Sequence, residues 1–402
     1  MIAAAILLAQ NGLVRAQNAQ PAATAESVVP APLDGRDGRE LALDQFRPKP
    51  MLKVAEHPLQ HAKFPAIDIH CHPGIRLHES SERLDEYVKL MDQHHIAVSV
   101  SLDAVVGQPF PEHVKYLWTK YPNRWCIFGH LDWRGAGDPA KPATWDCQRP
   151  DFGHRIARAL AECKQQGLSG MKVFKELGLG YRNPDGSLIK VDDPRWDPIW
   201  KACGELGLPI VIHTADPAAF FLPTDATNER WEELRRHPDW SFARPGYPTK
   251  EELHRQFLAI VARHRGTTFI GAHVASNAED LAEVGRWLDE HPNLYVDMAA
   301  RIAELGRQPY TARKFLTKYA DRVLFGTDGP RAHERLLYHW RFLETFDEYF
   351  PYAENPFPPQ GFWNIYGIGL EDDVLKKLYF ENAQRLVPSL KKQYEASAAT
   401  FK

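Results

Sequence analysis

The chain has 402 residues, with 49 Lys and Arg against 52 Asp and Glu, which gives a net charge of −3. Hydrophobic residues make up 44% and charged residues 25%, and this balance excludes a wholly disordered chain or a fibrous repeat. Without a basic excess we expect no nucleic-acid partner. No apolar run reaches the roughly 18 residues of a membrane span. The 18 histidines are many for this length and make a metal site worth seeking.

The N-terminal region differs from the rest of the chain. Residues 1–19 contain a short apolar run, Ile2 to Ala9, followed by small residues suited to cleavage, and this pattern predicts a signal peptide. Residues 20–63 are rich in Ala, Pro and charge, and predict an arm on the surface. We therefore expect export to the periplasm or the medium. The protein is cytoplasmic if the apolar run is not a signal. The five cysteines include no CxxC pair and predict buried thiols rather than a disulfide framework.

From residue 64 onward, short β-branched runs alternate with amphipathic segments. The predicted strands are 66–70, 96–102, 125–129, 170–174, 208–213, 268–273, 294–297 and 322–326. The predicted helices include one around Leu84, Val88 and Met91, and segments 152–164, 197–206, 251–264, 279–290 and 311–319. His94 and His95 follow the first of these helices, and we expect them to be exposed to solvent.

Eight strands alternating with helices predict an α/β fold, a distorted (β/α)8 TIM barrel over residues 64–388, with a C-terminal tail at 389–402. An open doubly wound sheet is the alternative, but no GxGxxG follows a strand.

Two long connections do not fit a bare barrel. The insertion after the fifth strand, residues 216–250, carries several aromatic residues, and residues 349–368 are dense in Pro and aromatics. We expect the insertion to cover the mouth of the barrel, with Trp231 and Phe221 as candidate substrate-binding residues. The alternative is packing against the outer helices or a second subunit.

Chemistry in a barrel is expected where the strands end. His70 and His72 are two apart in the first strand, so their imidazoles face the same side. His213 ends the fifth strand, His273 the sixth, and Asp328 follows the eighth. Imidazole and carboxylate are zinc ligands, and the combination predicts a metal site. A metal-free polar network in a binding protein is the alternative.

These residues resemble a known group. Asp-Ile-His-Cys-His-Pro at 68–73, the strand-end His213 and His273, and Gly-Thr-Asp at 326–328 resemble the amidohydrolase superfamily, in its amidohydrolase-related branch. That branch contains metal-dependent hydrolases and non-oxidative decarboxylases on a distorted TIM barrel. The segment 378–386 resembles its terminal helix.

The resemblance implies a role for each residue. His70, His72 and His213 would bind a divalent metal, with zinc as the default on ligand type. Asp328 would ligate weakly and accept a proton from bound water. His273 would polarise the substrate oxygen or bind a second metal.

Lys172 decides between one ion and two. It stands in the fourth strand, where a carbamylated lysine bridges two metals in binuclear members. Single-metal sites are commoner in this branch, so we favour one ion, with Lys172 as a substrate contact or an exposed strand end; Lys175 is the other candidate. Arg301 and Arg331 are candidates for binding an anionic group of the substrate.

These observations predict a metal-dependent hydrolase acting on a small amide, lactone or ester. The alternatives are a decarboxylase of an aromatic or unsaturated acid, and a binding protein without turnover. Every expected ligand position is filled, which disfavours the last. A homo-oligomer is compatible with the sequence.

Overall fold

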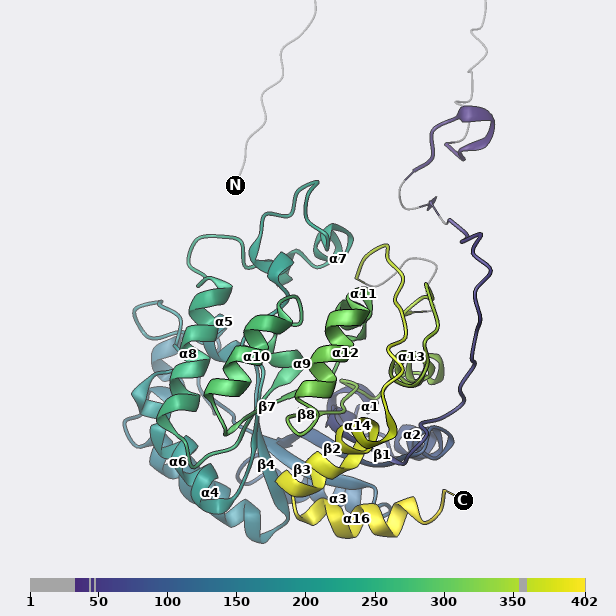
Figure 1. Ribbon diagram of the computed structural model, residues 1–402. Coiled ribbons are helices and arrows are strands. Elements are labelled where there is room, and N and C mark those ends of the chain that lie inside the picture. Colours follow the sequence, from purple (N-terminus) through teal and green to yellow (C-terminus); the bar gives the residue numbers. More distant parts are fainter. Residues whose placement is uncertain (1–32, 43–44, 47, 354–359, 402) are drawn as a thin grey trace, which may run out of the picture. The chain divides into compact units, whose positions relative to one another are not determined.

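The computed structural model describes residues 33–42, 45–46, 48–353 and 360–401. Within them, eight parallel strands form one sheet in chain order (Figure 1). The strands are β1 (Ala66–Cys71), β2 (Ile96–Val105), β3 (Trp125–His130), β4 (Leu168–Val173), β5 (Ile210–Ile212), β6 (Phe269–Gly271), β7 (Leu294–Asp297) and β8 (Val323–Leu324). Each overlaps a strand predicted from the sequence, and the TIM-barrel prediction is confirmed.

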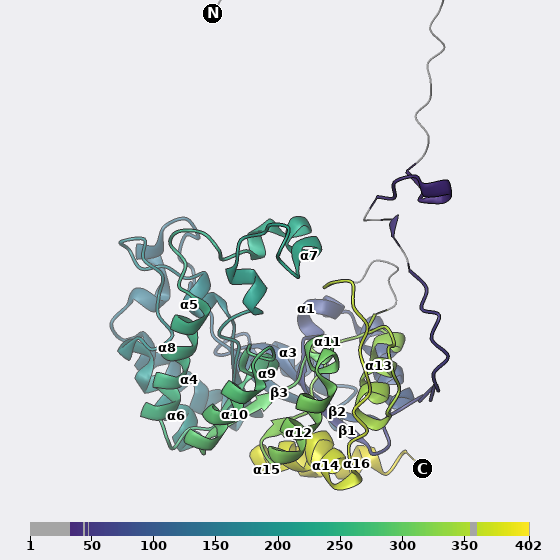
Figure 2. The ribbon, with the colours of Figure 1, turned by 45° about the horizontal axis from the view of Figure 1, so that its top comes forward.

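Helices surround the sheet, as Figures 1 and 2 show. They are α1 (Pro73–Leu77), α2 (Ser81–Gln93), α3 (Phe110–Trp118), α4 (Phe152–Gln165), α5 (Glu176–Leu179), α6 (Asp197–Leu206), α7 (Trp231–Arg236), α8 (Lys250–Arg263), α9 (Ala272–Ala275), α10 (Leu281–Glu290), α11 (Ile302–Arg307), α12 (Pro309–Lys318), α13 (His333–Glu344), α14 (Asp372–Lys376), α15 (Asn382–Leu386) and α16 (Ser389–Ala398).

The barrel closes between its last strand and its first. The backbone N–H of Ile69 donates to the carbonyl of Phe325 at 3.1 Å, and that of His72 donates to Gly329 at 2.7 Å. The register of β1 is irregular between Asp68 and Cys71. An irregularity of this kind re-aims the side chains beside it. The closure therefore brings the segment that carries Asp328 alongside the end of β1.

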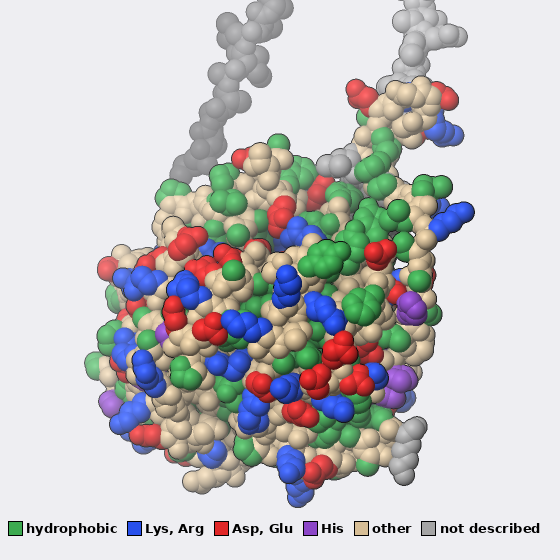
Figure 3. Space-filling model, viewed as in Figure 1, with side chains coloured by type: hydrophobic (Ala, Val, Ile, Leu, Met, Phe, Trp, Pro, Cys, Tyr) green, Lys and Arg blue, Asp and Glu red, His purple; other side chains and the backbone are tan. Residues whose placement is uncertain are grey.

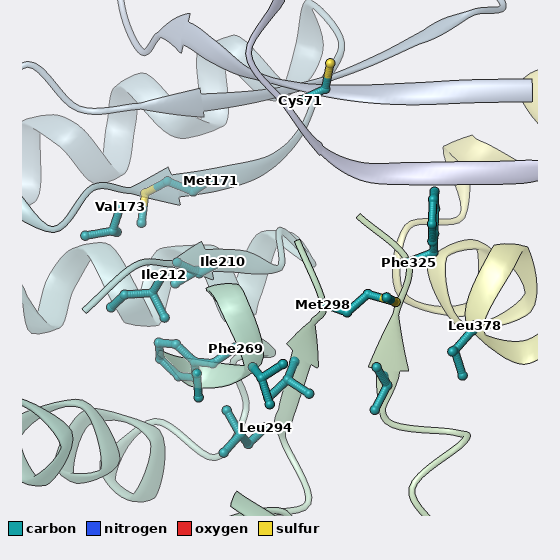
Figure 4. Close-up of a cluster of buried hydrophobic side chains, with 14 of the residues drawn as sticks. Cys71, Met171, Val173, Ile210, Ile212, Phe269, Leu294, Met298, Phe325 and Leu378 are labelled. Atoms are coloured by element: carbon teal, nitrogen blue, oxygen red, sulfur yellow. The ribbon is translucent and has the colours of Figure 1, made fainter. Parts of the chain in front are cut away.

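Strand residues alternate between two buried layers, one between the sheet and the helices and one inside the barrel. Figure 4 shows Met171 and Val173 of β4, with Ile210 and Ile212 of β5, in the hydrophobic cluster between the sheet and the helices. Successive strand residues face opposite sides. Lys172, between two of these residues, therefore points into the barrel, where it is 1% exposed.

Helix α16 replaces the predicted C-terminal tail. Leu390 and Ser397 are buried, and Gln393 donates to the carbonyl of Trp125 at 2.7 Å. Ser397 donates to the carbonyl of Asn123 at 3.0 Å. The helix therefore packs where β3 begins, at the end of the barrel opposite α7 (Figure 1). The sequence did not show this because the helix has few apolar residues.

The predicted signal peptide, residues 1–19, lies outside the described residues. The chain divides into two units, Met1–Pro50 and Met51–Lys402. In the first, Asp34 forms a salt bridge with Arg36 at 2.7 Å. In the second, residues 51–63 of the predicted arm lie along the barrel. There His57 Nδ1 is 2.5 Å from Asp347 Oδ1.

The expectation that His94 is exposed is wrong. His94 caps the C-terminus of α2 and is fully buried. Its Nδ1 accepts a hydrogen bond from Trp340 Nε1 at 3.0 Å, and its Nε2 lies 2.8 Å from His333 Nδ1. Helix α13 covers this end of α2, which amphipathic periodicity alone could not reveal.

All five cysteines are buried and free, as predicted. Across the described ranges, none of the helices has the length and apolar composition to span a bilayer. On the face shown in Figure 3, acidic and basic side chains are interspersed.

Candidate metal centre

Two overlapping groups of potential ligands lie at the carboxyl ends of the strands. His70, His72 and Asp328 form one, and His70, His273 and Asp297 form the other. Within each group, one ligand atom of every residue lies within 4.8 Å of the others. The structure thus brings together four of the predicted site residues and adds Asp297.

Buried carboxylates orient the two histidines of β1. His70 Nδ1 lies 2.9 Å from Asp297 Oδ2, and His72 Nδ1 lies 2.5 Å from Asp103 Oδ1. Because a carboxylate accepts, each Nδ1 carries the proton and each Nε2 keeps its lone pair. A carboxylate that accepts the proton of the other ring nitrogen is typical of a metal-ligating histidine. The donor set therefore fits a divalent ion.

Asp103 was not identified as a site residue from the sequence. It lies in β2, beside a register irregularity between Ser101 and Ala104, and is 8% exposed. The one available signal was an acid inside a strand whose other residues are apolar or Ser.

Hydrogen bonds to the end of β7 and the segment after it orient His273. It follows β6 in a left-handed backbone conformation, with φ 60°. Its Nδ1 donates to the carbonyl of Ala299 at 2.8 Å, and its backbone N–H donates to Asp297 Oδ1 at 2.9 Å. Burial, with the neighbouring His213, holds the pKa of His273 well below its usual value. His273 is therefore a neutral imidazole with a free Nε2.

Lys172 contacts the first ligand group directly. Its Nζ lies 3.3 Å from His70 Nε2, in the barrel interior. Burial lowers the pKa of Lys172 to about 8. The other lysine candidate, Lys175, instead pairs with Asp216 Oδ2 at 2.5 Å.

His213 belongs to neither ligand group among the described residues. Its ring centroid lies 4.5 Å from that of His273. Its Nε2 is buried without a hydrogen bond, 3.4 Å from Asp216 Oδ1. An orphaned nitrogen beside the site is consistent with an absent ligand. Asp216, the first residue of the insertion, was not identified from the sequence.

Two guanidinium groups hold Asp328. Its Oδ1 accepts from Arg76 at 2.9 Å and its Oδ2 from Arg331 at 3.0 Å, while His72 Nε2 lies 3.7 Å away. Burial alone would raise the pKa of Asp328, but the charges of Arg331 and Arg76 outweigh this effect and lower the pKa below its usual range. Arg331, predicted to bind substrate, is thus engaged by Asp328.

A cavity of about 390 Å³ opens above these groups. The insertion forms part of its wall, and residues 349–368 contribute Tyr352 and Gln360. The predicted aromatic contacts are wrong in detail. Phe221 lines a separate cavity and Trp231 lines neither, whereas Phe220 and Trp240 line the cavity over the site. Arg301, a candidate for binding an anionic group, also lines it and is 7% exposed.

The amidohydrolase family profile matches residues 67–388. The chain therefore belongs to the amidohydrolase family and is an enzyme of the hydrolase or lyase type. A comparison with curated proteins gives no significant match.

Solved structures with a similar fold include three bacterial proteins. A dihydroxybenzoic acid decarboxylase from a Polaromonas species, with bound manganese, has 18% identity over 81% of this chain and 96% of that chain, with TM-score 0.49. A probable 2-pyrone-4,6-dicarboxylic acid hydrolase from Acinetobacter baumannii has 11% identity over 80% and 99%, with TM-score 0.45. An uncharacterized TIM-barrel protein from Bordetella bronchiseptica has 15% identity over 82% and 99%, with TM-score 0.48.

Proposed function

We propose that this enzyme is a metal-dependent hydrolase that cleaves a C–N or C–O bond of a small amide, lactone or ester. One observation carries the proposal. His70 and His72 have their Nδ1 atoms fixed by buried carboxylates, and each offers a ligand atom within 4.8 Å of one on Asp328. That arrangement leaves two Nε2 lone pairs and a carboxylate beside one cavity.

His70, His72, His213 and Asp328 would hold the ion, and zinc suits this ligand set. When bound, the ion lowers the pKa of water and polarises the bond to be cleaved. Asp328 accepts the proton, because its guanidinium partners keep it ionised near neutral pH. Since His273 is neutral with its proton on Nδ1, it has no Nε2 proton to donate to a substrate oxygen. This favours His273 as a further ligand.

In this proposal the site holds one ion, and Lys172 is an unmodified amine rather than a carbamylated bridge between two ions. The contact of Lys172 with His70 supports a role at the centre with or without modification, so the metal-to-protein ratio is the deciding measurement. We expect a metal-to-protein ratio near one. A ratio near two that falls in Lys172→Ala, and is partly restored by short carboxylic acids, would establish a bridging lysine instead.

The experiment is chelation and reconstitution. The protein is stripped with a chelator, reloaded separately with zinc, manganese, iron or nickel, and assayed on lactones, amides and phenolic acids. Hydrolysis that disappears on stripping and returns with one metal supports the proposal. Hydrolysis that survives complete stripping contradicts it.

A non-oxidative decarboxylase is the second candidate, and Arg301 favours it. This guanidinium lines the cavity together with His273, and could hold a carboxylate at the centre. In the same assay, release of carbon dioxide from a phenolic acid, without hydrolysis of any lactone or amide, would select this reaction.

Export and self-association are separate proposals. Export rests on the apolar run at residues 2–9, and self-association on the aromatic connections at residues 216–250 and 349–368. Cell fractionation tests export, and light scattering of the purified protein tests oligomerisation.

A further inference from the structure

The cavity over the candidate metal centre is lined by more cations than acids. Among the described residues its walls carry six cationic side chains and three acidic ones. The cations are Arg76, Lys175, Arg230, Arg301, Arg331 and Arg335, and the acids are Asp216, Glu233 and Asp328.

Four of these cations are already paired. Arg76 and Arg331 share Asp328, at 2.9 and 3.0 Å. Lys175 binds Asp216 at 2.5 Å, and Arg230 binds Glu233 at 2.8 Å and also Glu304. These ion pairs neutralise all three acids of the lining, so the excess positive charge belongs to the two remaining arginines.

Arg301 is one of the two. It follows β7, is 7% exposed, and its guanidinium donates to the carbonyl of Ala300 at 2.9 Å. In the described part of the chain, no carboxylate forms a salt bridge with it. The neighbouring acid Glu279 is itself bound to Lys250 at 3.2 Å. A mostly buried guanidinium without a carboxylate is costly unless a ligand pairs with it.

Arg335 is the other. It lies in the first turn of α13, half-buried, and lines the cavity beside Arg331. No acid within the described ranges forms a salt bridge with Arg335 either. Arg301 follows β7, and Arg335 lies beyond β8 and Asp328 in the chain. Both arginines line the same cavity as His273 and Asp328.

We propose that the substrate is a small molecule with two negatively charged groups, one bound by Arg301 and the other by Arg335, with the reacting bond between them. The planar guanidinium binds a carboxylate through two parallel hydrogen bonds. A cavity of about 390 Å³ is of small-ligand size. This inference rests on the proposed function, since it places the reacting bond at the same centre.

Rigid dicarboxylates test the inference without turnover. Binding of benzoate, phthalate, isophthalate and terephthalate to the metal-loaded protein is measured by titration calorimetry. We expect at least one dicarboxylate to bind about tenfold more tightly than benzoate, because a second charge-assisted contact forms. Arg335→Gln and Arg301→Gln should each abolish this preference while metal content stays unchanged. Arg158→Gln, on the exposed face of α4, is the matched control and should keep it.

Two binding results would overturn the inference, and one turnover result would do so as well. One is that no dicarboxylate binds more tightly than benzoate to the wild-type protein. The other is that the preference survives in Arg335→Gln or Arg301→Gln. A failure of the proposed function would be seen in the chelation and turnover assay, whereas a failure of this inference would be seen in the binding titrations. A metal-dependent hydrolysis confined to neutral substrates would sustain the function and refute the dianionic substrate.

Discussion

His70 Nδ1 lies 2.9 Å from Asp297 Oδ2, and both side chains are buried, at the carboxyl ends of β1 and β7, with β8 between these two strands. The other carboxylate oxygen of Asp297 accepts the backbone N–H of His273 at 2.9 Å. One carboxylate thus sets the tautomer of a ligand on β1 and the position of the residue that follows β6. Metal affinity should therefore depend on Asp297, because Asp297 orients His70 and His273.

Asp297→Asn should lower metal affinity about 10- to 100-fold, because an amide oxygen is a weaker acceptor for the His70 proton. Asp103→Asn should act likewise through His72. Competition with a fluorescent chelator measures both. Asp373→Asn, an exposed acid on α14, is the control. Unchanged affinity in both buried variants would show that these carboxylates only support the fold.

Asp328→Asn should retain metal and lose about 10²- to 10⁴-fold in kcat, because the amide cannot accept a proton. Asn keeps one acceptor oxygen, so one of the two hydrogen bonds that Asp328 accepts from Arg76 and Arg331 should remain. Parallel measurement of kcat and metal content checks this. Near-normal turnover would assign the proton transfer to another residue.

The predicted strands were recovered because β-branched runs separated by helical segments carry a strong local signal. The candidate ligand residues were proposed from the barrel's geometry, since every parallel strand ends at the same rim. Asp103 and Asp216 were missed for a different reason. Their roles depend on a register irregularity in β2 and on the path of the insertion, and neither is encoded in local spacing.

The insertion illustrates the same limit. Its position after β5 predicted that it would reach the cavity, and Asp216 and Phe220 do line it. Which aromatic faces inward depends on tertiary packing. Phe221 packs on Phe242 with ring centroids 5.3 Å apart, in the wall of the second cavity, and leaves Trp240 as an aromatic wall of the first.

Trp240→Ala should therefore change kcat/KM between small and large substrates, because the cavity loses a wall. Trp231→Ala, on the same insertion but outside the cavity lining, is the matched control and should leave the ratio unchanged. The measurement is kcat/KM for a homologous substrate series at constant metal content. Equal effects of the two variants would mean that the insertion acts only through stability.

The buried His94 predicts a pH dependence of stability. Burial, with the neighbouring His333, lowers its pKa from 6.5 to about 4. Between these two pH values, His94 is protonated in the unfolded chain and neutral in the folded chain. The contribution of His94 to the unfolding free energy is fully present above pH 6.5 and falls by up to about 3 kcal/mol as the pH drops towards 4.

Urea unfolding between pH 7.5 and 4 measures this slope. His94→Asn should be less stable at pH 7 but show a shallower loss on acidification. The buried His113, His254 and His339 also have lowered pKa values, so part of the slope remains in the variant. An identical slope in variant and wild type would exclude His94 as a contributor.

The central claim is that His70 and His72 bind a divalent metal at the rim of the barrel, and elemental analysis of His72→Ala tests it most directly. Wild-type protein and His154→Ala, an exposed histidine on α4, serve as controls. The account predicts about one ion per chain in both controls, and loss of most of the metal together with activity in His72→Ala. Full metal content in His72→Ala would contradict it and place the metal elsewhere.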